Sequence, residues 1–346
     1  MLQDVGIVAI GRNEGERLRR CLASSADLAR ILVYADSAST DESVEAARGF
    51  GIEVVELDPS RPLNAARGRN AGMQRLFERA PDVAYVFFVD GDCQVVPGFL
   101  EAARAALEAD PGLGAACGRR REVHPEASIY NRLVDAEWNT PVGEAMACGG
   151  DVLVRAAALR EIGGYDESMS CGEDPEMSFR LRAAGWRILR LGHDMTLHDV
   201  ALEHFGAWWR RHARGGYAFA HGAWRHFHGP EWFQLGDVAS ILGWGLLLPL
   251  ATAGTVVFGG PAGILLLSLY GVLAIRVWRW RRRRGDGVRS AAIHAAFLVI
   301  GKLAETTGVL RFLLGTLTGR GGGAPDYKDQ QRTEIGSPSP PPPRRR

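Results

Sequence analysis

Two carboxylates separated by one residue, Asp90 and Asp92, directly follow an apolar run at residues 83–89. Oxygen ligands of this kind suit Mg²⁺ or Mn²⁺, and a cation held by them can also bind a diphosphate. The alternative is that Asp90-Gly91 simply turns a hairpin between residues 85–89 and 93–96. The surrounding residues favour a metal site with Asp90 and Asp92 as its carboxylate ligands.

A further acidic residue, Asp36, ends another predicted strand at residues 31–35. Its carboxylate is suited to accept hydrogen bonds from a nucleotide base or a ribose. The alternative is that Asp36 only forms a turn or caps a helix, which we favour less. For the nearby Asp41, ligand binding and such a structural role are equally favoured. Asn13 follows the first predicted strand, so we expect several polar side chains at one edge of a sheet.

The sequence Glu173-Asp174-Pro175 opens a predicted helix. A carboxylate in this place is suited to accept the proton of a hydroxyl group that attacks a substrate. In the alternative, Asp174 only caps the helix and Pro175 is its first residue. Met177 at the third helical position excludes a capping box. We therefore favour Asp174 as a general base, with Glu173 as the second candidate.

Short β-branched runs alternate with amphipathic stretches over the first 92 residues. The strands and helices that these segments form must position Asn13, Asp36, Asp90 and Asp92. The apolar runs lack strict polar alternation, which is typical of strands buried on both faces of a parallel sheet. This pattern predicts an α/β domain with a mostly parallel sheet flanked by helices and a ligand site at the carboxyl ends of the strands. Strands are predicted at 5–10, 31–35, 52–57, 83–89, 113–119 and 187–191, and helices at 14–25, 41–50, 98–109 and 176–184.

Charge and cysteine content exclude several classes of protein. With 41 Lys+Arg against 40 Asp+Glu, the chain has no overall basic surface for nucleic acid. The five cysteines are odd in number and form no C-x-x-C pair, so neither a disulfide framework nor a thiolate zinc site is predicted. No signal-like segment precedes the first strand. We therefore expect the N-terminal part to be reduced and cytosolic.

An uncharged apolar run extends from residue 238 to residue 275. As a helix it would be roughly 57 Å long, close to twice the roughly 30 Å hydrocarbon core of a bilayer. A transmembrane hairpin over residues 238–280 is therefore predicted, with its turn at Gly259-Gly260-Pro261. A buried hairpin in the core of a larger soluble fold is the alternative.

Trp278, Trp280 and the cluster Arg281–Arg284 mark one end of this hairpin. Interfacial aromatic and positive residues predict that this end lies on the cytoplasmic side. Both ends of a hairpin lie on one side, so the N-terminal domain is also expected there, in a multi-pass protein of the inner (plasma) membrane.

Residues 288–318 are apolar but contain Lys302, Glu305 and Arg311. This composition predicts an interfacial amphipathic or re-entrant helix at an anionic lipid surface. Residues 226–237 are predicted to be a linker, and residues 319–346 have the composition of a disordered tail.

From residue 5 to about residue 225 the chain resembles the family 2 glycosyltransferases, whose GT-A fold is a Rossmann-like α/β domain. The C-terminal segments are similar to those of membrane-anchored bacterial members. The resemblance rests on six motifs in this order: Ile10-Gly11-Arg12-Asn13-Glu14, Asp36-x-x-Ser39-Thr40-Asp41, Ala66-Arg67-Gly68-Arg69-Asn70-Ala71-Gly72, Asp90-Gly91-Asp92, Cys148-Gly149-Gly150, and Glu173-Asp174 followed by Phe179-Arg180.

The resemblance implies a role for each matched residue. Asp36 would contact the nucleotide base, Arg69 the nucleotide moiety, Asp92 would be the principal ligand of Mg²⁺ or Mn²⁺, and Asp174 the general base of an inverting transfer. His198 is the nearest match to a downstream histidine of the family and is either a metal ligand or a hydrogen-bonded structural residue. Further donor-binding residues are Asn13, Glu14, Asp90, Gly149, Gly150, Arg211 and Arg214.

The implied function is transfer of a sugar from a nucleoside-diphosphate sugar to a lipid-linked or membrane-proximal glycan acceptor. Processive members carry a Q/R-x-x-R-W motif, and the partial match at Arg211–Arg214 leaves processivity open. A nucleotide-sugar-forming nucleotidyltransferase and a non-catalytic membrane scaffold that retains the fold are the alternatives. A nicotinamide-dependent dehydrogenase is excluded, because G-x-G-x-x-G does not follow the first strand.

Overall fold

The computed structural model describes residues 1–229, 231–319 and 324. These residues divide into two compact units. The first comprises residues 1–203 and 221–234, and we call it the catalytic unit because it contains Asp92 and Asp174, for which the family resemblance implies catalytic roles; the second comprises residues 204–220 and 235 onward. The predicted tail lies almost entirely outside the described residues.

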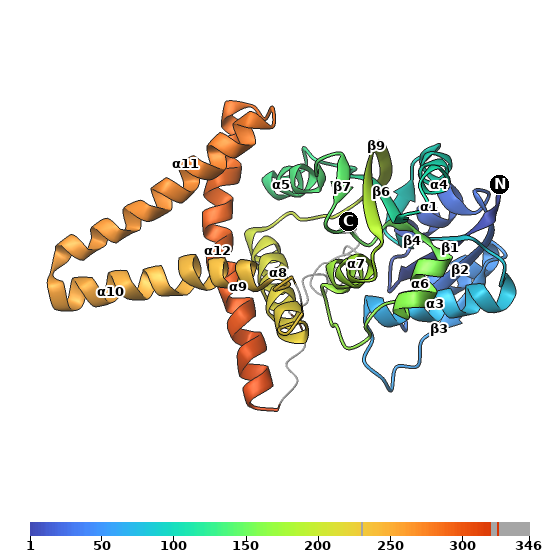
Figure 1. Ribbon diagram of the computed structural model, residues 1–346, viewed down its shortest axis with the longest axis horizontal. Helices are drawn as coiled ribbons and strands as arrows, with labels where there is room; N and C mark the ends of the chain where they lie inside the picture. Colours follow the sequence, from blue (N-terminus) through green and yellow to red (C-terminus); the bar gives the residue numbers. More distant parts are fainter. Residues whose placement is uncertain (230, 320–323, 325–346) are drawn as a thin grey trace, which may run out of the picture. The chain divides into compact units, whose positions relative to one another are not determined.

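A nine-stranded sheet forms the centre of the catalytic unit, in the order β3-β2-β1-β4-β8-β6-β9-β5, with β7 paired to β9 (Figure 1). Six strands run in one direction, and only β5, β7 and β8 run the other way. The prediction of a mostly parallel α/β sheet is confirmed. The strands are β1 (Leu2–Gly11), β2 (Ala29–Asp36), β3 (Glu53–Glu56), β4 (Tyr85–Asp90), β5 (Cys93–Val95), β6 (Leu113–Glu122), β7 (Gly143–Ala145), β8 (Val152–Arg155) and β9 (Arg187–His198).

Helices follow the strands in the alternation that the apolar pattern predicts. Each predicted helix is present, and α3, α5, α6 and α8 are additional to them. The helices of this part of the chain are α1 (Glu16–Ser25), α2 (Ser43–Gly49), α3 (Ala65–Arg79), α4 (Phe99–Ala109), α5 (Ile129–Trp138), α6 (Ala156–Ile162), α7 (Glu173–Ala183) and α8 (Phe205–Arg225).

Parallel pairing brings the ends of three strands together. Gly11 at the end of β1 is in register with Asp36 on β2, and Ile10 is in register with Asp90 on β4. In the sheet order, β2 lies on one side of β1 and β4 lies on the other, so the strand order changes direction between β1 and β4. Ligands bind at such a point in open α/β sheets. The fold thus gathers the acidic residues predicted from sequence at one edge.

The second unit is helical. Residues Leu235–Gly259 form α9 (Leu235–Leu242), a π-helical turn η1 (Gly243–Leu247) and α10 (Leu248–Gly259). After Gly260, at φ 89°, residues Pro261–Arg283 form the 3₁₀ segment η2 (Pro261–Leu267) and α11 (Ser268–Arg283). A last helix, α12 (Val288–Leu317), coincides with the predicted interfacial segment.

Two helical stretches of the second unit, Leu235–Gly259 and Pro261–Arg283, are long and apolar enough to cross a membrane. They meet at one tip of the hairpin (Figure 1). Few of their side chains are buried within the described residues.

Helix α3 packs on the sheet through a glycine. A Cβ atom at Gly72 would overlap Cγ1 of Val8, which is fully buried in the middle of β1. We expect Gly72→Ala to destabilise the catalytic unit by about 1–3 kcal/mol, because a stiff β-branched side chain would have to move. Thermal unfolding of the full chain in detergent measures the effect.

Gly49→Ala is the matched control, because no atom lies within 4 Å of a Cβ built at that helical position. Its stability should be unchanged or slightly higher. Equal melting temperatures for the two variants would show that α3 does not need this close approach.

Candidate active site

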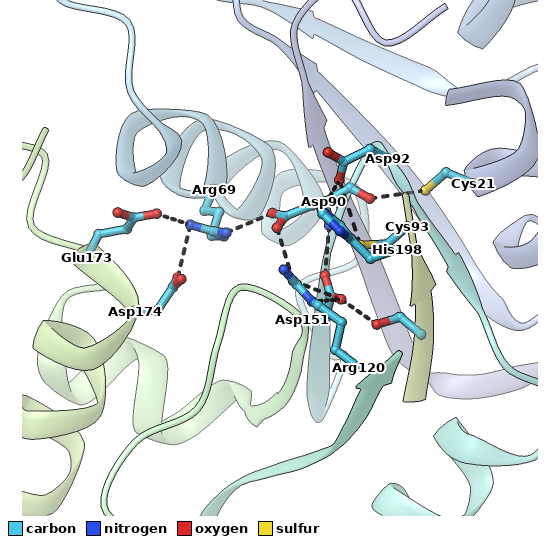
Figure 2. Close-up of polar contacts among 11 residues, drawn as sticks. Cys21, Arg69, Asp90, Asp92, Cys93, Arg120, Asp151, Glu173, Asp174 and His198 are labelled. Atoms are coloured by element: carbon cyan, nitrogen blue, oxygen red, sulfur yellow. Dashed lines mark hydrogen bonds and ion pairs between the residues drawn. The ribbon is translucent and has the colours of Figure 1, made fainter. Parts of the chain in front are cut away.

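The buried guanidinium group of Arg69, on α3, is the centre of the site. Arg69 is only 2% exposed and contacts three carboxylates from distant parts of the chain. Its Nη2 donates to Asp90 Oδ1 at 2.8 Å, its Nη1 donates to Glu173 Oε1 at 2.7 Å, and Asp174 Oδ1 lies 3.1 Å from Nη1 (Figure 2). Arg69 thereby links the end of β4 to the start of α7.

A second arginine, Arg120 on β6, holds the other oxygen of Asp90. Arg120 Nη2 lies 3.0 Å from Asp90 Oδ2, and its Nε donates to Asp151 Oδ2 at 2.9 Å. Asp151 is fully buried and also accepts from the Asp90 backbone N–H and from Thr196. Asp90 therefore lies between two guanidinium groups (Figure 2).

Asp92 points to different partners from Asp90. Its Oδ1 lies 3.2 Å from Nε2 of His198, at the end of β9, and 3.7 Å from the Sγ of Cys93. Donor atoms of these three buried residues lie within 4.8 Å of one another, close enough to hold one metal ion. Nδ1 of His198 is buried and has no hydrogen-bond partner among the described residues.

The hairpin alternative for Asp90-Gly91-Asp92 is wrong. β4 pairs with β1 and β8, whereas β5 pairs with β9, so the two strands on either side of Gly91 do not pair with each other. The segment is a connection between distant parts of the sheet, and it carries Asp92 to the end of β9.

Asp36 is buried in a small polar cluster. It accepts from Tyr34 Oη at 2.9 Å and from the Ser39 backbone N–H at 2.7 Å. Burial raises the pKa of Tyr34, and the neighbouring Asp36 raises it further, so the phenol remains a donor. The turn role proposed as an alternative for Asp36 is present, and its contact with a nucleotide base stays a prediction.

Asn13, in the loop after β1, adopts a positive φ of 55°. Its side-chain oxygen accepts from the Thr40 backbone N–H at 2.7 Å, and its own N–H donates to Ser39 Oγ at 2.8 Å. The loop after β1 is thus tied to the loop after β2. Glu14 is buried and pairs with Arg17 at 2.8 Å.

The two glycines of the Cys148-Gly149-Gly150 motif differ in their surroundings. A Cβ atom at Gly150 would overlap Arg69 Nη2 and come within 2.9 Å of Asp90 Oδ2, whereas Gly149 has open space there. Only Gly150 is therefore required by the Arg69–Asp90 contact. Arg211 and Arg214 lie on the part of α8 that belongs to the second unit. Their role in donor binding stays a prediction.

The N-cap alternative for Asp174 is wrong. Helix α7 begins at Glu173, its N-cap is Gly172 in the left-handed region at φ 80°, and no side chain caps it. Asp174 is therefore free of a capping bond and faces Arg69 (Figure 2). Burial raises the pKa of Asp174 to about 8; Arg69 opposes this shift, and Glu173 adds to it.

Carboxylates outnumber guanidinium groups in the contacts described above. These contacts involve five carboxylates, those of Asp90, Asp92, Asp151, Glu173 and Asp174, and the guanidinium groups of Arg69 and Arg120. A diphosphate would be repelled by this arrangement unless a cation came with it. The site can hold a cation at Asp92 and His198 and offers a carboxylate of raised pKa at Asp174.

Sequence reasoning missed Arg120, Asp151 and Cys93. Asp151 directly follows the Gly149-Gly150 pair, and Arg120 lies in a run of three arginines at the end of a predicted strand. The available signal was that an arginine at the end of a buried strand needs a carboxylate partner. The pairing of Arg120 with Asp151 could not be predicted, because the two residues come from different parts of the chain.

Comparison with known proteins decides the family. The profile of glycosyl transferase family 2 matches residues 7–147, and that of glycosyl transferase family group 2 matches residues 85–303, more than half of the chain. The chain belongs to the family 2 glycosyltransferases. The predicted resemblance is confirmed, and so is the GT-A fold.

A mannosyltransferase from Pyrobaculum calidifontis, solved with GDP-Man and Mn²⁺, has the same fold as this glycosyltransferase. The TM-score is 0.60 at 18% identity, and the match covers 89% of this chain and 87% of that one.

Two curated relatives come from Mycobacterium tuberculosis. A pre-mycofactocin glycosyltransferase is 27% identical over 208 residues, covering 57% of this chain and 43% of the relative. An N-acetylglucosaminyl-diphospho-decaprenol L-rhamnosyltransferase is 26% identical over 234 residues, covering 56% and 76%. This glycosyltransferase thus spans less than half of the length of the first of these relatives.

Removal of the Arg69 charge from this glycosyltransferase should leave three carboxylates without their shared partner. We expect Arg69→Gln to lower stability by about 3–5 kcal/mol, as loss of one member of a buried ion pair does. The loss should grow as the pH rises from about 7 to 9, because Asp174, whose pKa is raised to about 8, is neutral below this range and is charged and without its arginine above it. Melting temperatures across this range measure it.

The control is Arg61→Gln, which removes a largely exposed pair with Glu167. Exposed pairs contribute about 0–1 kcal/mol, so this variant should melt close to the wild type at every pH. A pH-independent loss for Arg69→Gln would contradict the electrostatic explanation.

Proposed function

We propose that the chain transfers a sugar from a nucleoside-diphosphate sugar to a membrane-proximal acceptor, with inversion at the anomeric carbon. The observation that carries this proposal is that a carboxylate of raised pKa, Asp174, and an anionic cluster suited to a cation occur together at the carboxyl edge of a GT-A sheet. The name of the decaprenol-linked relative supports a lipid-linked acceptor.

Asp92 and His198 are the residues that would hold a divalent cation. They are buried and adjacent, His198 has an unpartnered ring nitrogen, and carboxylates outnumber guanidinium groups in the contacts described above. Carboxylate and imidazole ligands are compatible with Mg²⁺ or Mn²⁺, and the Mn²⁺ in the Pyrobaculum structure favours the latter. When bound, the cation would stabilise the charge on the departing diphosphate. Asp90 would become a further ligand of this cation when its carboxylate separates from Arg69 and Arg120.

The protein residues account for the rest of the transfer. The acceptor oxygen forms a bond to the anomeric carbon while the bond from that carbon to the diphosphate oxygen breaks. Asp174 takes the acceptor proton, and the nucleoside diphosphate leaves with the electron pair. Arg69 holds Asp174 and Glu173 in place before the acceptor arrives, and its contact with the donor stays a prediction.

We propose that residues Leu235–Gly259 and Pro261–Arg283 cross the inner membrane as a hairpin. Their length and apolar composition support this proposal, and Arg281–Arg284 would keep both ends on the cytoplasmic side. The catalytic unit would then lie in the cytoplasm, and α12 would lie at the anionic lipid surface. An acceptor anchored in that membrane would be within reach.

Asp92→Ala tests the cation site. We expect the affinity for UDP or GDP in the presence of Mn²⁺ to fall at least about tenfold, because the principal anionic ligand is lost. Isothermal titration with and without Mn²⁺ measures it. Asp82→Ala, which removes an exposed partner of Arg30, is the control. Unchanged, Mn²⁺-dependent affinity in Asp92→Ala would remove Asp92 from the cation site.

Asp174→Asn tests the base. Transfer should fall by about two to four orders of magnitude while nucleotide binding persists, since Asn keeps the size of the side chain but not its basicity. In the wild type, kcat/KM should rise with pH through the raised pKa of about 8, because only the deprotonated carboxylate accepts a proton. Steady-state kinetics across pH measures both effects.

Glu167→Gln, at a partly exposed carboxylate paired with Arg61, is the control for that experiment and should transfer at the normal rate. Near-normal transfer by Asp174→Asn would place the base elsewhere, with Glu173 the next candidate. A wild-type protein that binds donor and never transfers sugar would indicate the scaffold alternative.

A further inference from the structure

Three large aromatic side chains are exposed on one short segment of the catalytic unit. Trp224 is 63% exposed, Phe227 is 52% exposed and Trp232 is 69% exposed. All belong to the described part of residues 221–234, which we call the strap. Among the other described residues of the catalytic unit, Phe50 is the only exposed aromatic, and the other exposed large apolar side chains are Met1, Val142 and Met146.

The strap directly precedes the first candidate membrane span. Trp232 is three residues before Leu235, where that span begins, so the backbone between them reaches at most about 11 Å. The end of an apolar span lies at the level of the lipid headgroups, and tryptophan is enriched there because its ring is apolar and its N–H is polar. With Leu235–Gly259 crossing the membrane as proposed above, chain connectivity places Trp232 near a headgroup layer.

Other side chains of the strap hold α7, the helix that begins with Glu173 and Asp174. His226 Nε2 lies 2.9 Å from Oε1 of Glu176, a carboxylate that is completely buried and also binds Arg180. The ring of Phe179 lies 4.6 Å from that of His226 and 4.7 Å from that of Phe233.

Two ion pairs reinforce this attachment. Arg182 near the end of α7 donates to both carboxylate oxygens of Glu231, and Arg225 donates to Asp166 at 2.8 Å. The strap thus combines polar and aromatic contacts to α7 with three aromatic side chains that are more than half exposed.

We propose that the strap seats the catalytic unit on the phospholipid headgroup layer through Trp224, Phe227 and Trp232, and so holds the base helix α7 at the membrane surface. The occupant of this aromatic surface is the lipid itself, because the surface continues into the candidate span. The consequence for substrate class rests on the proposed function: the acceptor hydroxyl reaches Asp174 from the lipid surface.

A fluorescent probe tests the seating directly. The full-length Phe227→Cys variant is labelled with an environment-sensitive dye and reconstituted into vesicles of phosphatidylcholine and phosphatidylglycerol. All five native cysteines are buried, which favours labelling at the new site. We expect a blue-shifted emission that lipids carrying a quencher at the headgroup level reduce, as for a side chain at the interface.

Glu126→Cys, at an exposed position in an ion pair with Arg132, is the matched control and should report water. A probe at residue 227 that behaves like the one at 126 overturns the proposal. A blue-shifted probe that the lipid quencher does not reach also overturns it, because the surface would then be covered by protein.

The consequence for the acceptor has a separate test. In a variant with Trp224→Ser, Phe227→Ser and Trp232→Ser, transfer to an acceptor embedded in the bilayer should fall by about tenfold or more, whereas nucleotide binding and transfer to a water-soluble acceptor should persist. Phe50→Ser is the control. Equal losses with both acceptors would overturn the consequence for the acceptor. Absence of any transfer by the wild type would contradict the proposed function and leave the probe result unaffected.

Discussion

The buried guanidinium group of Arg69 is the constraint on which the site depends. Removing a charge from water is unfavourable unless good partners replace the solvent. Here the partners are Asp90 from β4 and the pair Glu173 and Asp174 from α7. Burial alone would lower the pKa of Arg69, and the surrounding carboxylates raise it, so the group stays charged. The requirement to satisfy this charge fixes α3, β4 and α7 relative to one another.

The first half of the sheet could be predicted from sequence because each strand is a short apolar run and each following helix is amphipathic. Asp36 and Asp90 could then be placed at one edge, since parallel strands end at the same side. The candidate base Asp174 could also be predicted, because Glu173-Asp174-Pro175 marks the start of a helix. These predictions needed only local patterns and one rule of topology.

Other parts of the site could not be read in this way. Strands β5 and β7 have three residues each, too few for a period-2 pattern. The partners of Arg69 come from segments more than 100 residues away as well as from a nearby strand, and charge pairing carries no sequence signal at such distances. The cap of α7 is a glycine in the left-handed region, which the sequence pattern does not show, so the alternative of an Asp174 cap could be rejected only from the structure.

The π-helical turn at Gly243–Leu247 affects how the first candidate span should be compared with other sequences. Thr306 of α12 donates to the Ile241 carbonyl at 3.2 Å immediately before this turn. A π turn accommodates one residue more than an α turn, which rotates everything after it by about 100° around the helix axis. Side chains that share a face before Gly243 thus continue on another face from Leu248 onward. Loss of a single residue there would restore a regular helix and present a different set of α10 side chains to the same surroundings, so an alignment gap at this point would mark a change of face rather than a change of length.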